Sequence, residues 1–286
     1  MTFTLGIALA LVCSFATNLA FLYKHRGACA APLVDVRHPL RTARGLYASK
    51  WFAIGMAIAF GAWLLHVAAL ALAPLSVVQA VLSTGVVLLA VTAEAFFGFK
   101  VGPRQRWGVG LTAAGLLLLV LTLPAAPGAH SSFSVTGMVA FEAGLLLVGG
   151  LLIVGRRLGG RAHHHGIMLG AASGVLFGVS DVAIKALTGL VGEAGMIGLL
   201  SPWLAVAMLG SVIAFYASAR GLQTGEAVPV IATTGTAANV SCILGGIVVF
   251  GDPLPGTASG IAIALLAFMM VCAAGLLAPA PLRAAG

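Results

Sequence analysis

Two oppositely charged side chains, Asp181 and Lys185, stand four residues apart inside a strongly apolar stretch of the chain. On a helix this spacing places both on one face, where they can neutralise each other. A charge at the centre of a bilayer costs ~2.5–3.5 kcal/mol on insertion scales, so a charge kept there usually has a partner or a function. The sequence leaves two interpretations open. The pair is either a structural salt bridge, or a gate in which a proton or cation that reaches Asp181 releases Lys185.

Most other polar groups in the apolar stretches are uncharged. Gln79 and Asn239 carry amides, which need hydrogen-bond partners in hydrocarbon. Asn18 stands at about the same depth in the first apolar segment as Asp181 does in a later one. We therefore predict a pocket near the middle of the membrane. Its expected lining is Asn18, Gln79, Asp181, Lys185, Thr233 and Asn239.

Two further titratable residues lie in apolar segments. Glu142 has no cation at helical spacing, so it is either protonated or paired from another helix, and we rank it second as a proton carrier. For His66 we favour a hydrogen-bonded packing histidine over a titrating group. The sequence contains no nucleophile–base arrangement, phosphate loop or metal cluster, so we expect neither an enzyme nor a cofactor, and we identify no metal site.

Composition restricts the class of protein. Hydrophobic residues make up 60% of the chain and charged residues only 8%, whereas a soluble domain carries about 25% charged residues. The net charge of +8 resides in short connections between apolar runs, which is typical of membrane proteins rather than nucleic-acid-binding proteins. We expect the lipid bilayer as a partner and no nucleic acid. The 4 cysteines show no paired short spacing, so neither a disulfide nor a zinc site is indicated.

Nine apolar segments have about the length that a membrane-spanning helix needs. They are 3–23, 51–72, 75–97, 107–123, 135–154, 166–190, 202–219, 228–250 and 256–276. If all nine span, every Lys and Arg except Lys185 falls on one side of the membrane. Since cytoplasmic loops collect these residues, we predict an outside N-terminus and a cytoplasmic C-terminus. The polar stretch 27–49 is expected to contain a short interfacial segment held to anionic lipid.

The nine segments divide into two similar sets. Segments one and six are both rich in small residues, and the links FFGFKVGP and VVFGDPLP follow the third segment of each set. We predict a single transmembrane domain over 1–286, in which repeat one (3–123) and repeat two (166–276) are joined by a linking helix (135–154). Because five segments precede the second copy, the two four-helix repeats are inverted, as in many secondary transporters. The fold class is therefore an all-α membrane protein. A GxxxGxxxG stripe, Gly170, Gly174 and Gly178, predicts that segment six lies in the protein core.

These motifs resemble a known family. The stretch GEAVPVIATTGTAANVSCILGGIVVFGDPLP and the earlier FFGFKVGPRQ and GVGLTAAGLLLL look like the second halves of EamA-type repeats in the drug/metabolite transporter superfamily. Nine segments, an isolated first helix ending near YKHRG and an intramembrane SDVAIKAL resemble the NIPA-type magnesium-transporter branch. The first copy carries Lys100 where the second carries Asp252. The resemblance implies a membrane transporter, with Mg²⁺ as one substrate.

The sequence thus favours a secondary transporter in the plasma membrane that moves a small polar solute or metabolite by alternating access. A NIPA-like transporter of Mg²⁺ or another divalent cation is the first alternative. A divalent cation prefers oxygen ligands, and a pocket with one acid beside a lysine offers few. A membrane scaffold that transports nothing is the second alternative. The substrate, the coupling ion, the direction of transport and a homodimeric assembly are left open.

Overall fold

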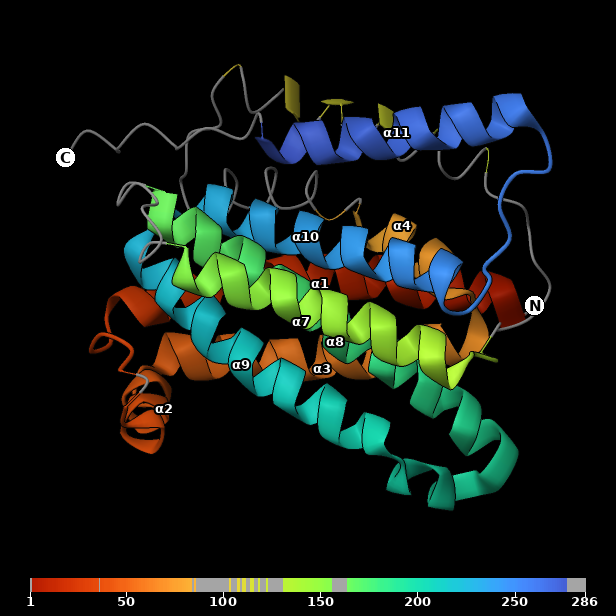
Figure 1. The fold of residues 1–286 in the computed structure, drawn as a ribbon. Coiled ribbons are helices and arrows are strands. Elements are labelled where there is room, and N and C mark those ends of the chain that lie inside the picture. The colour runs from red at the N-terminus through yellow and green to blue at the C-terminus, as the bar shows by residue number, and fades with distance from the viewer. Residues whose placement is uncertain are drawn as a thin grey trace.

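The computed structural model describes residues 2–35, 37–83, 85, 131–155 and 164–276, together with single positions between 103 and 122. Within these ranges every regular element is a helix, and the long helices lie side by side in a bundle (Figure 1). They are α1 (Thr2–Cys29), α2 (Pro39–Tyr47), α3 (Lys50–Leu72), α4 (Leu75–Ser83), α7 (Val135–Val154), α8 (His165–Ala194), α9 (Pro202–Thr224), α10 (Ala227–Val248) and α11 (Ala258–Leu276). A 3₁₀ helix, Gly195–Leu200, follows α8.

Six of the described helices are long and apolar enough to cross a membrane: α1, α3, α7, α8, α9 and α10. The predicted all-helical, multi-pass membrane architecture is therefore confirmed. The predicted segments 75–97 and 107–123 lie largely outside the described residues, as do the links 97–106 and 155–163 over most of their length. The count of nine helices and the inverted repeat consequently stay predictions.

The bundle is organised around α8. Within its most apolar stretch 72% of α8 is buried, compared with 17% of α7, so α8 is central and α7 peripheral. The glycine stripe of α8 explains how α10 packs closely against α8. A β-carbon at Gly174 would overlap the carbonyl of Thr234, and one at Gly170 would lie 2.9 Å from the carbonyl oxygen of Val230. The prediction that this segment lies in the core, packed closely against a neighbouring backbone, is confirmed.

The first helix is longer than the sequence suggested. We expected it to end at 23, with Lys24 and Arg26 in a loop, but α1 continues to Cys29 and carries both residues on its last turns. Lys, Arg and Ala are good helix formers, and Pro32 is the first strong helix breaker beyond them. This end of α1 packs tightly on α3, because a β-carbon at Gly55 would lie 2.8 Å from the backbone nitrogen of Lys24.

The connection from α1 to α2 is held by α9. The amide of Gln223 donates to the carbonyls of Ala28 and Pro32 at 3.1 and 2.9 Å and accepts from the Val34 nitrogen at 2.9 Å. The hydroxyl of Tyr216 donates to the Pro39 carbonyl where α2 begins.

Just before α2, a hydrogen bond between the exposed side chains of His38 and Asp35 lowers the pKa of the Asp35 carboxyl from its ordinary value. The short helix predicted within 27–49 is present as α2, whereas its attachment to lipid stays a prediction.

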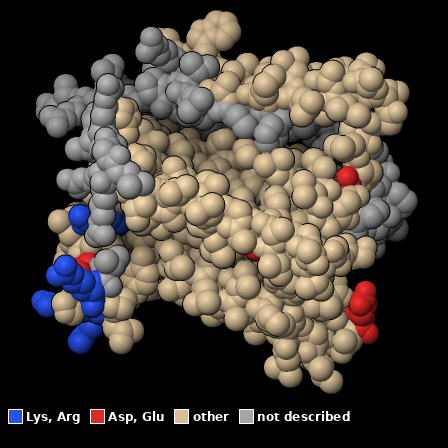
Figure 2. Space-filling view, in the orientation of Figure 1, with Lys and Arg blue, Asp and Glu red and all other residues tan. Residues whose placement is uncertain are grey.

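Charge is distributed unevenly along the bundle. Lys and Arg gather at the end where α2 lies, and acidic side chains are visible at the other end (Figure 2). We call these the basic end and the opposite end. Of the lysines and arginines that the structure describes, Lys185 is the one buried within the bundle near the opposite end. The predicted topology, in which alternate connections carry the positive charge, stays a prediction, because most cations of the later connections lie outside the described residues.

Candidate functional site

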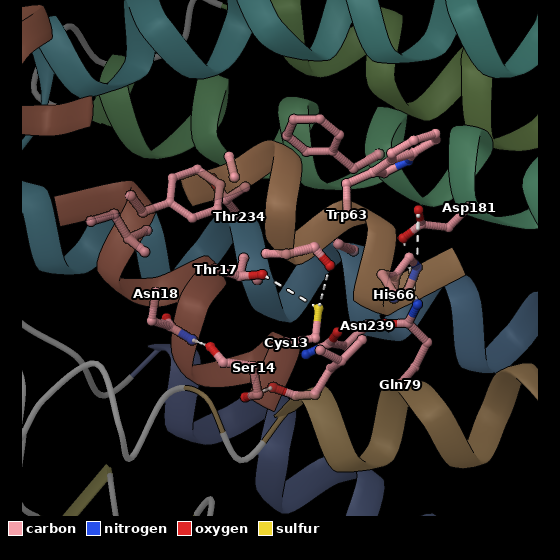
Figure 3. Close-up of a pocket in the computed structure, with 18 of the residues that line it drawn as sticks. Cys13, Ser14, Thr17, Asn18, Trp63, His66, Gln79, Asp181, Thr234 and Asn239 are labelled. Atoms are coloured by element: carbon pink, nitrogen blue, oxygen red, sulfur yellow. Dashed lines mark hydrogen bonds and ion pairs between the residues drawn. The ribbon is translucent and has the colours of Figure 1, made fainter. Parts of the chain in front are cut away.

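A cavity of about 210 Å³ lies between α1, α3, α4, α8 and α10. Asp181 and His66 line it in the middle of the bundle (Figure 3). Its lining extends from there to Lys24, near the basic end. Aromatic side chains of Phe21, Trp63 and Phe177 form part of its wall. The uncharged polar groups that line it are Ser14, Thr17, Asn18, Gln79, Thr234 and Asn239. A largely apolar cavity with a few convergent polar groups is the usual form of a small-molecule site.

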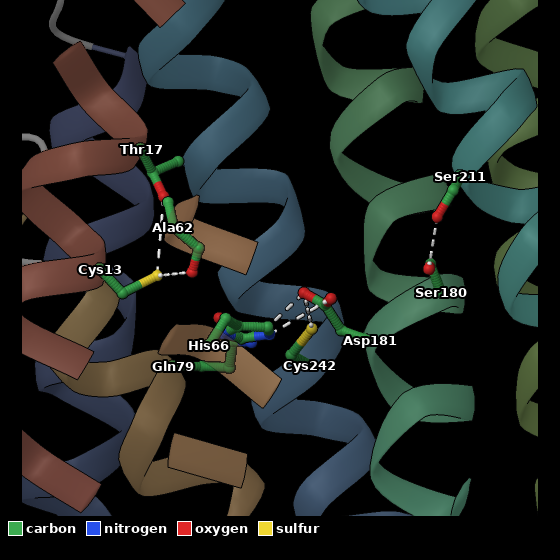
Figure 4. A network of polar contacts seen from close by, with 9 residues as sticks. All are labelled: Cys13, Thr17, Ala62, His66, Gln79, Ser180, Asp181, Ser211 and Cys242. Atoms are coloured by element: carbon green, nitrogen blue, oxygen red, sulfur yellow. Dashed lines mark hydrogen bonds and ion pairs between the residues drawn. The ribbon is translucent and has the colours of Figure 1, made fainter. Parts of the chain in front are cut away.

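Asp181 is the centre of the polar contacts at the inner end (Figure 4). Its Oδ1 lies 3.3 Å from Nε2 of His66, which makes an ion pair when the histidine is protonated. Its Oδ2 accepts from Gln79 Nε2 at 3.4 Å and from the thiol of Cys242 at 3.7 Å. We call these four residues the inner cluster. It joins α3, α4, α8 and α10, and the Asp181 side chain is still 19% exposed to the cavity.

The structure brings together most of the predicted pocket. Asn18, Gln79, Asp181 and Asn239 all line the cavity. Thr233 does not; its neighbour Thr234 lines the cavity instead, and the Thr234 hydroxyl donates to the carbonyls of Gly170 and Val230. A shift of one residue turns a helical side chain by about a quarter turn or more, so the segment was predicted well and the facing residue was not.

Asp181 and Lys185 do not share a contact. Lys185 is fully buried, and its ammonium donates to the carbonyls of Leu70 and Ala73 at 2.8 and 3.0 Å. These are among the last carbonyls of α3, which have no partner within the helix, and a lysine stabilises such an end through both charge and hydrogen bonds. Lys185 therefore contacts the end of α3, not the cavity.

A second polar contact holds the neighbouring turn. The carboxylate of Asp252, which is 3% exposed, accepts at 2.8 Å from the Ser76 nitrogen in the first turn of α4. Gly251 makes this possible, because its φ of 65° turns the chain back after α10. Lys185 and Asp252 thus fix the two sides of the α3–α4 turn. We call this pair the opposite-end clamp.

Sequence reasoning missed several lining residues. Cys13, whose thiol donates to the Ala62 carbonyl at 3.1 Å, lines the cavity beside Ser14 and Thr17. A signal for them exists in the helical spacing, since Ser14, Asn18, Phe21 and Lys24 follow one another every three or four residues along one face of α1.

His66 is 6% exposed and contacts Asp181 within the inner cluster, which agrees with the predicted packing histidine held by a polar partner. Glu142 lies outside the cavity lining. It is 4% exposed, and neither carboxyl oxygen has a hydrogen-bond partner among the described residues.

The described part of the chain contains no group of three or more His, Cys, Asp or Glu residues placed to hold a metal ion. Oxygen donors in the cavity come instead from one carboxylate, from amides and from hydroxyls. Such a set does not replace the water shell of Mg²⁺, an ion that usually keeps several of its waters.

The apolar helices and the cavity define the chain as a multi-pass helical membrane protein with a largely apolar cavity inside the bundle, in which a few polar groups converge. Comparison with curated proteins relates it to a transporter. It is 27% identical to a probable magnesium transporter, NIPA9, of Arabidopsis thaliana, over 93% of this chain and 79% of that protein. It is also 25% identical to an uncharacterized protein of Corynebacterium glutamicum, over 76% of each chain. No protein-family model and no solved structure matches the chain.

Proposed function

We propose that this protein is a plasma-membrane transporter that moves a small polar solute through the cavity by alternating access. The observation that carries the proposal is the cavity itself, with Asp181 at its inner end. Its walls come from both predicted repeats: α1, α3 and α4 from repeat one, and α8 and α10 from repeat two. In secondary transporters with inverted repeats, substrate sites lie near the bilayer midplane between the two repeats.

The packing of the described helices supports the predicted duplication. α1 packs most extensively on α3, and α8 packs most extensively on α9. These pairs occupy corresponding places, first and second, in the two predicted repeats. Exchange of their arrangements would move the opening of the cavity from one side of the membrane to the other.

The two ends of the bundle differ in a way that fits one state of such a cycle. The cavity reaches Lys24 near the basic end, whereas the opposite-end clamp fixes the α3–α4 turn on the other side. With the predicted orientation, in which the basic end is cytoplasmic, this is an inward-facing state. In this orientation the N-terminus of the chain lies outside the cell and the C-terminus lies inside.

Mg²⁺ is a second candidate for the cargo, because of the similarity to the probable magnesium transporter. In this case Asp181, with the amide oxygens of Gln79 and Asn239, would bind the ion through its water shell. At ~30 Å³ per water, a cavity of about 210 Å³ has room for several waters around an ion. Glu142, buried and without a described partner, is our candidate for a proton carrier.

The first test is flux into proteoliposomes that contain the purified protein. Mg²⁺ entry is read by an entrapped magnesium dye, and solute entry by mass spectrometry after incubation with a mixture of small polar metabolites. We compare the native chain with Asp181→Asn and, as a matched control, with Glu193→Gln, an exposed acid outside the cavity. Saturable flux of either cargo that Asp181→Asn abolishes and Glu193→Gln preserves would support the proposal. If neither cargo enters faster than it enters empty vesicles, the proposed transport function is overturned and the scaffold alternative is favoured.

A further inference from the structure

A second cavity of about 200 Å³ lies closer to the basic end, between α1, α3, α8 and α9. α3 and α9 meet there through Phe52 and Phe215, whose rings contact edge to face with 6.0 Å between their centroids. Met56, Ser211 and Ser218 also line it. No acidic residue is among those that line this cavity in the described part of the chain.

The two cavities are adjacent, because three residues line both of them. These are Lys24 from α1, Ala59 from α3 and Phe177 from α8. We call these three residues the neck. A solute that moves from the second cavity to the inner cluster has to pass the neck, and it meets an aromatic ring and an ammonium there.

The position of Lys24 at the neck is built into the fold. Its backbone nitrogen and its Cγ contact α3 at Gly55, where a β-carbon would lie 2.8 Å from each. Its ammonium lies over the ring of Phe21, 3.8 Å from the centroid, in a cation–π contact. No carboxylate of the described residues lies within ion-pair distance of Lys24. Its charge at the neck is therefore not neutralised by a neighbouring acid.

We infer that Lys24 makes the neck a charge filter, so that the cargo is a small organic solute with an anionic group and not a free divalent cation. The anionic group passes Lys24, and the polar remainder reaches Asp181 and Gln79 at the inner cluster. A bare or hydrated divalent cation would have to approach an unneutralised ammonium inside an apolar wall, where charges interact more strongly than in water. The inference rests on the proposed transport function and chooses between its two cargo candidates.

The electrostatic part can be measured without knowing the cargo. The 4 native cysteines are replaced by serine, and one cysteine is introduced at the neck as Ala59→Cys. The rate of modification is measured with an anionic and with a cationic methanethiosulfonate reagent of similar size. We expect the ratio of the anionic to the cationic modification rate to be higher at this cysteine than with a free thiol in solution. Lys24→Gln should lower the ratio of the two rates at least about tenfold, while Lys24→Arg should keep it.

Lys50→Gln, which removes a cation that lines neither cavity, is the matched control and should leave the ratio unchanged. If Ala59→Cys does not yield folded protein, Thr17→Cys in the first cavity replaces it, with the same expected direction. A ratio that Lys24→Gln does not change would overturn the filter, whatever the protein transports.

The flux assay completes the test. In proteoliposomes, Lys24→Gln should reduce uptake of anionic metabolites from the mixture and should raise any residual Mg²⁺ entry. Rapid Mg²⁺ entry into vesicles with the native chain, unaffected by Lys24→Gln, would contradict the inference while leaving the transport function in place. If no cargo enters the vesicles, while the ratio of the two modification rates is the one that the filter predicts, the transport function is contradicted. Only the electrostatics of the neck would then be confirmed.

Discussion

The buried ammonium of Lys185 contributes to stability through the end of α3 and not through a carboxylate beside it. Lys185→Met keeps the length of the side chain but removes both hydrogen bonds to the carbonyls of Leu70 and Ala73. Hydrogen bonds to a charged group contribute about 1.5–3 kcal/mol each. Relief of the cost of burying the charge offsets part of the loss, so we expect a net destabilisation of about 2 kcal/mol.

Thermal unfolding in detergent, followed by circular dichroism, measures this effect. Lys50→Met removes a lysine from the first position of α3 and serves as the control, which should change the unfolding temperature little. If Lys185→Met unfolds at the same temperature as the native chain, the contact with α3 is not a source of stability.

The fate of the predicted site residues shows what a sequence can and cannot specify at this scale. Amides and acids inside apolar segments need partners, and this rule, with the matching depth of Asn18 and Asp181, placed Asn18, Gln79 and Asp181 in one cavity. Helical spacing does not decide which partner a long side chain selects. The ammonium of Lys185 donates to carbonyls of α3, whereas the carboxylate of Asp181 contacts His66, which also lies on α3. Such choices depend on neighbours that are distant in the chain.

Close packing of α8 on α10 depends on glycine at the contact. Gly174→Val would place a branched side chain against the Thr234 carbonyl and the Ala238 nitrogen, both of them backbone atoms that cannot yield. Overpacking of this kind typically costs 1–3 kcal/mol, so we expect about 3 kcal/mol of destabilisation or loss of folded protein. The yield of monodisperse protein in size-exclusion chromatography and its unfolding temperature are the measurements.

Gly150 of α7 provides the matched control, because a β-carbon there meets nothing within 4 Å. Gly150→Val should be produced at native yield and unfold near the native temperature. Equal losses in both variants would mean that the cost arises from helix propensity, and that the α8–α10 contact does not require a small residue.

The α1–α2 connection depends on one side chain of α9. Gln223→Leu removes three hydrogen bonds, to Ala28, Pro32 and Val34, and each is worth about 1 kcal/mol. We expect this connection to open locally while the bundle remains folded. Limited trypsin digestion should then cleave at Arg37 or Arg41 several times faster than in the native chain. Thr224→Val, which removes an exposed hydroxyl bonded within its own helix, should leave the cleavage rate unchanged.

At the scale of helices, hydropathy located the six described spans but did not fix all of their ends. Segment 135–154 was predicted at the bounds that α7 has, because its apolar run stops at both sides. α8 continues to Ala194, beyond the predicted 190, since nothing in that stretch breaks a helix before Gly195, with its φ of 66°. The role of Gln223 had no signal in the sequence. Its partners are carbonyls and a backbone nitrogen, which any residue provides.

At the scale of the whole molecule, the two ends of the bundle differ in their relation to the cavity. Asp181 faces a cavity that leads toward the basic end, and beyond the inner cluster the opposite-end clamp holds the α3–α4 turn. The clamp residues fall in predicted repeat two, while the turn that they hold falls in predicted repeat one. Release of this contact would therefore let the two predicted repeats separate at that end, which is what alternating access requires.

Sided thiol labelling tests this arrangement directly. In a chain with its native cysteines replaced, Thr17→Cys places one thiol in the cavity wall. A membrane-impermeant maleimide should label it much faster in inside-out vesicles than in right-side-out vesicles, because the basic end is predicted to be cytoplasmic. Asp252→Ala removes the acceptor of the Ser76 nitrogen, a helix cap worth about 1 kcal/mol. Since this shifts a two-state equilibrium roughly fivefold toward opening, labelling from the right-side-out face should rise by a similar factor. Labelling of the parent protein from the right-side-out face alone would show that the cavity, or the topology, is the reverse of the one proposed.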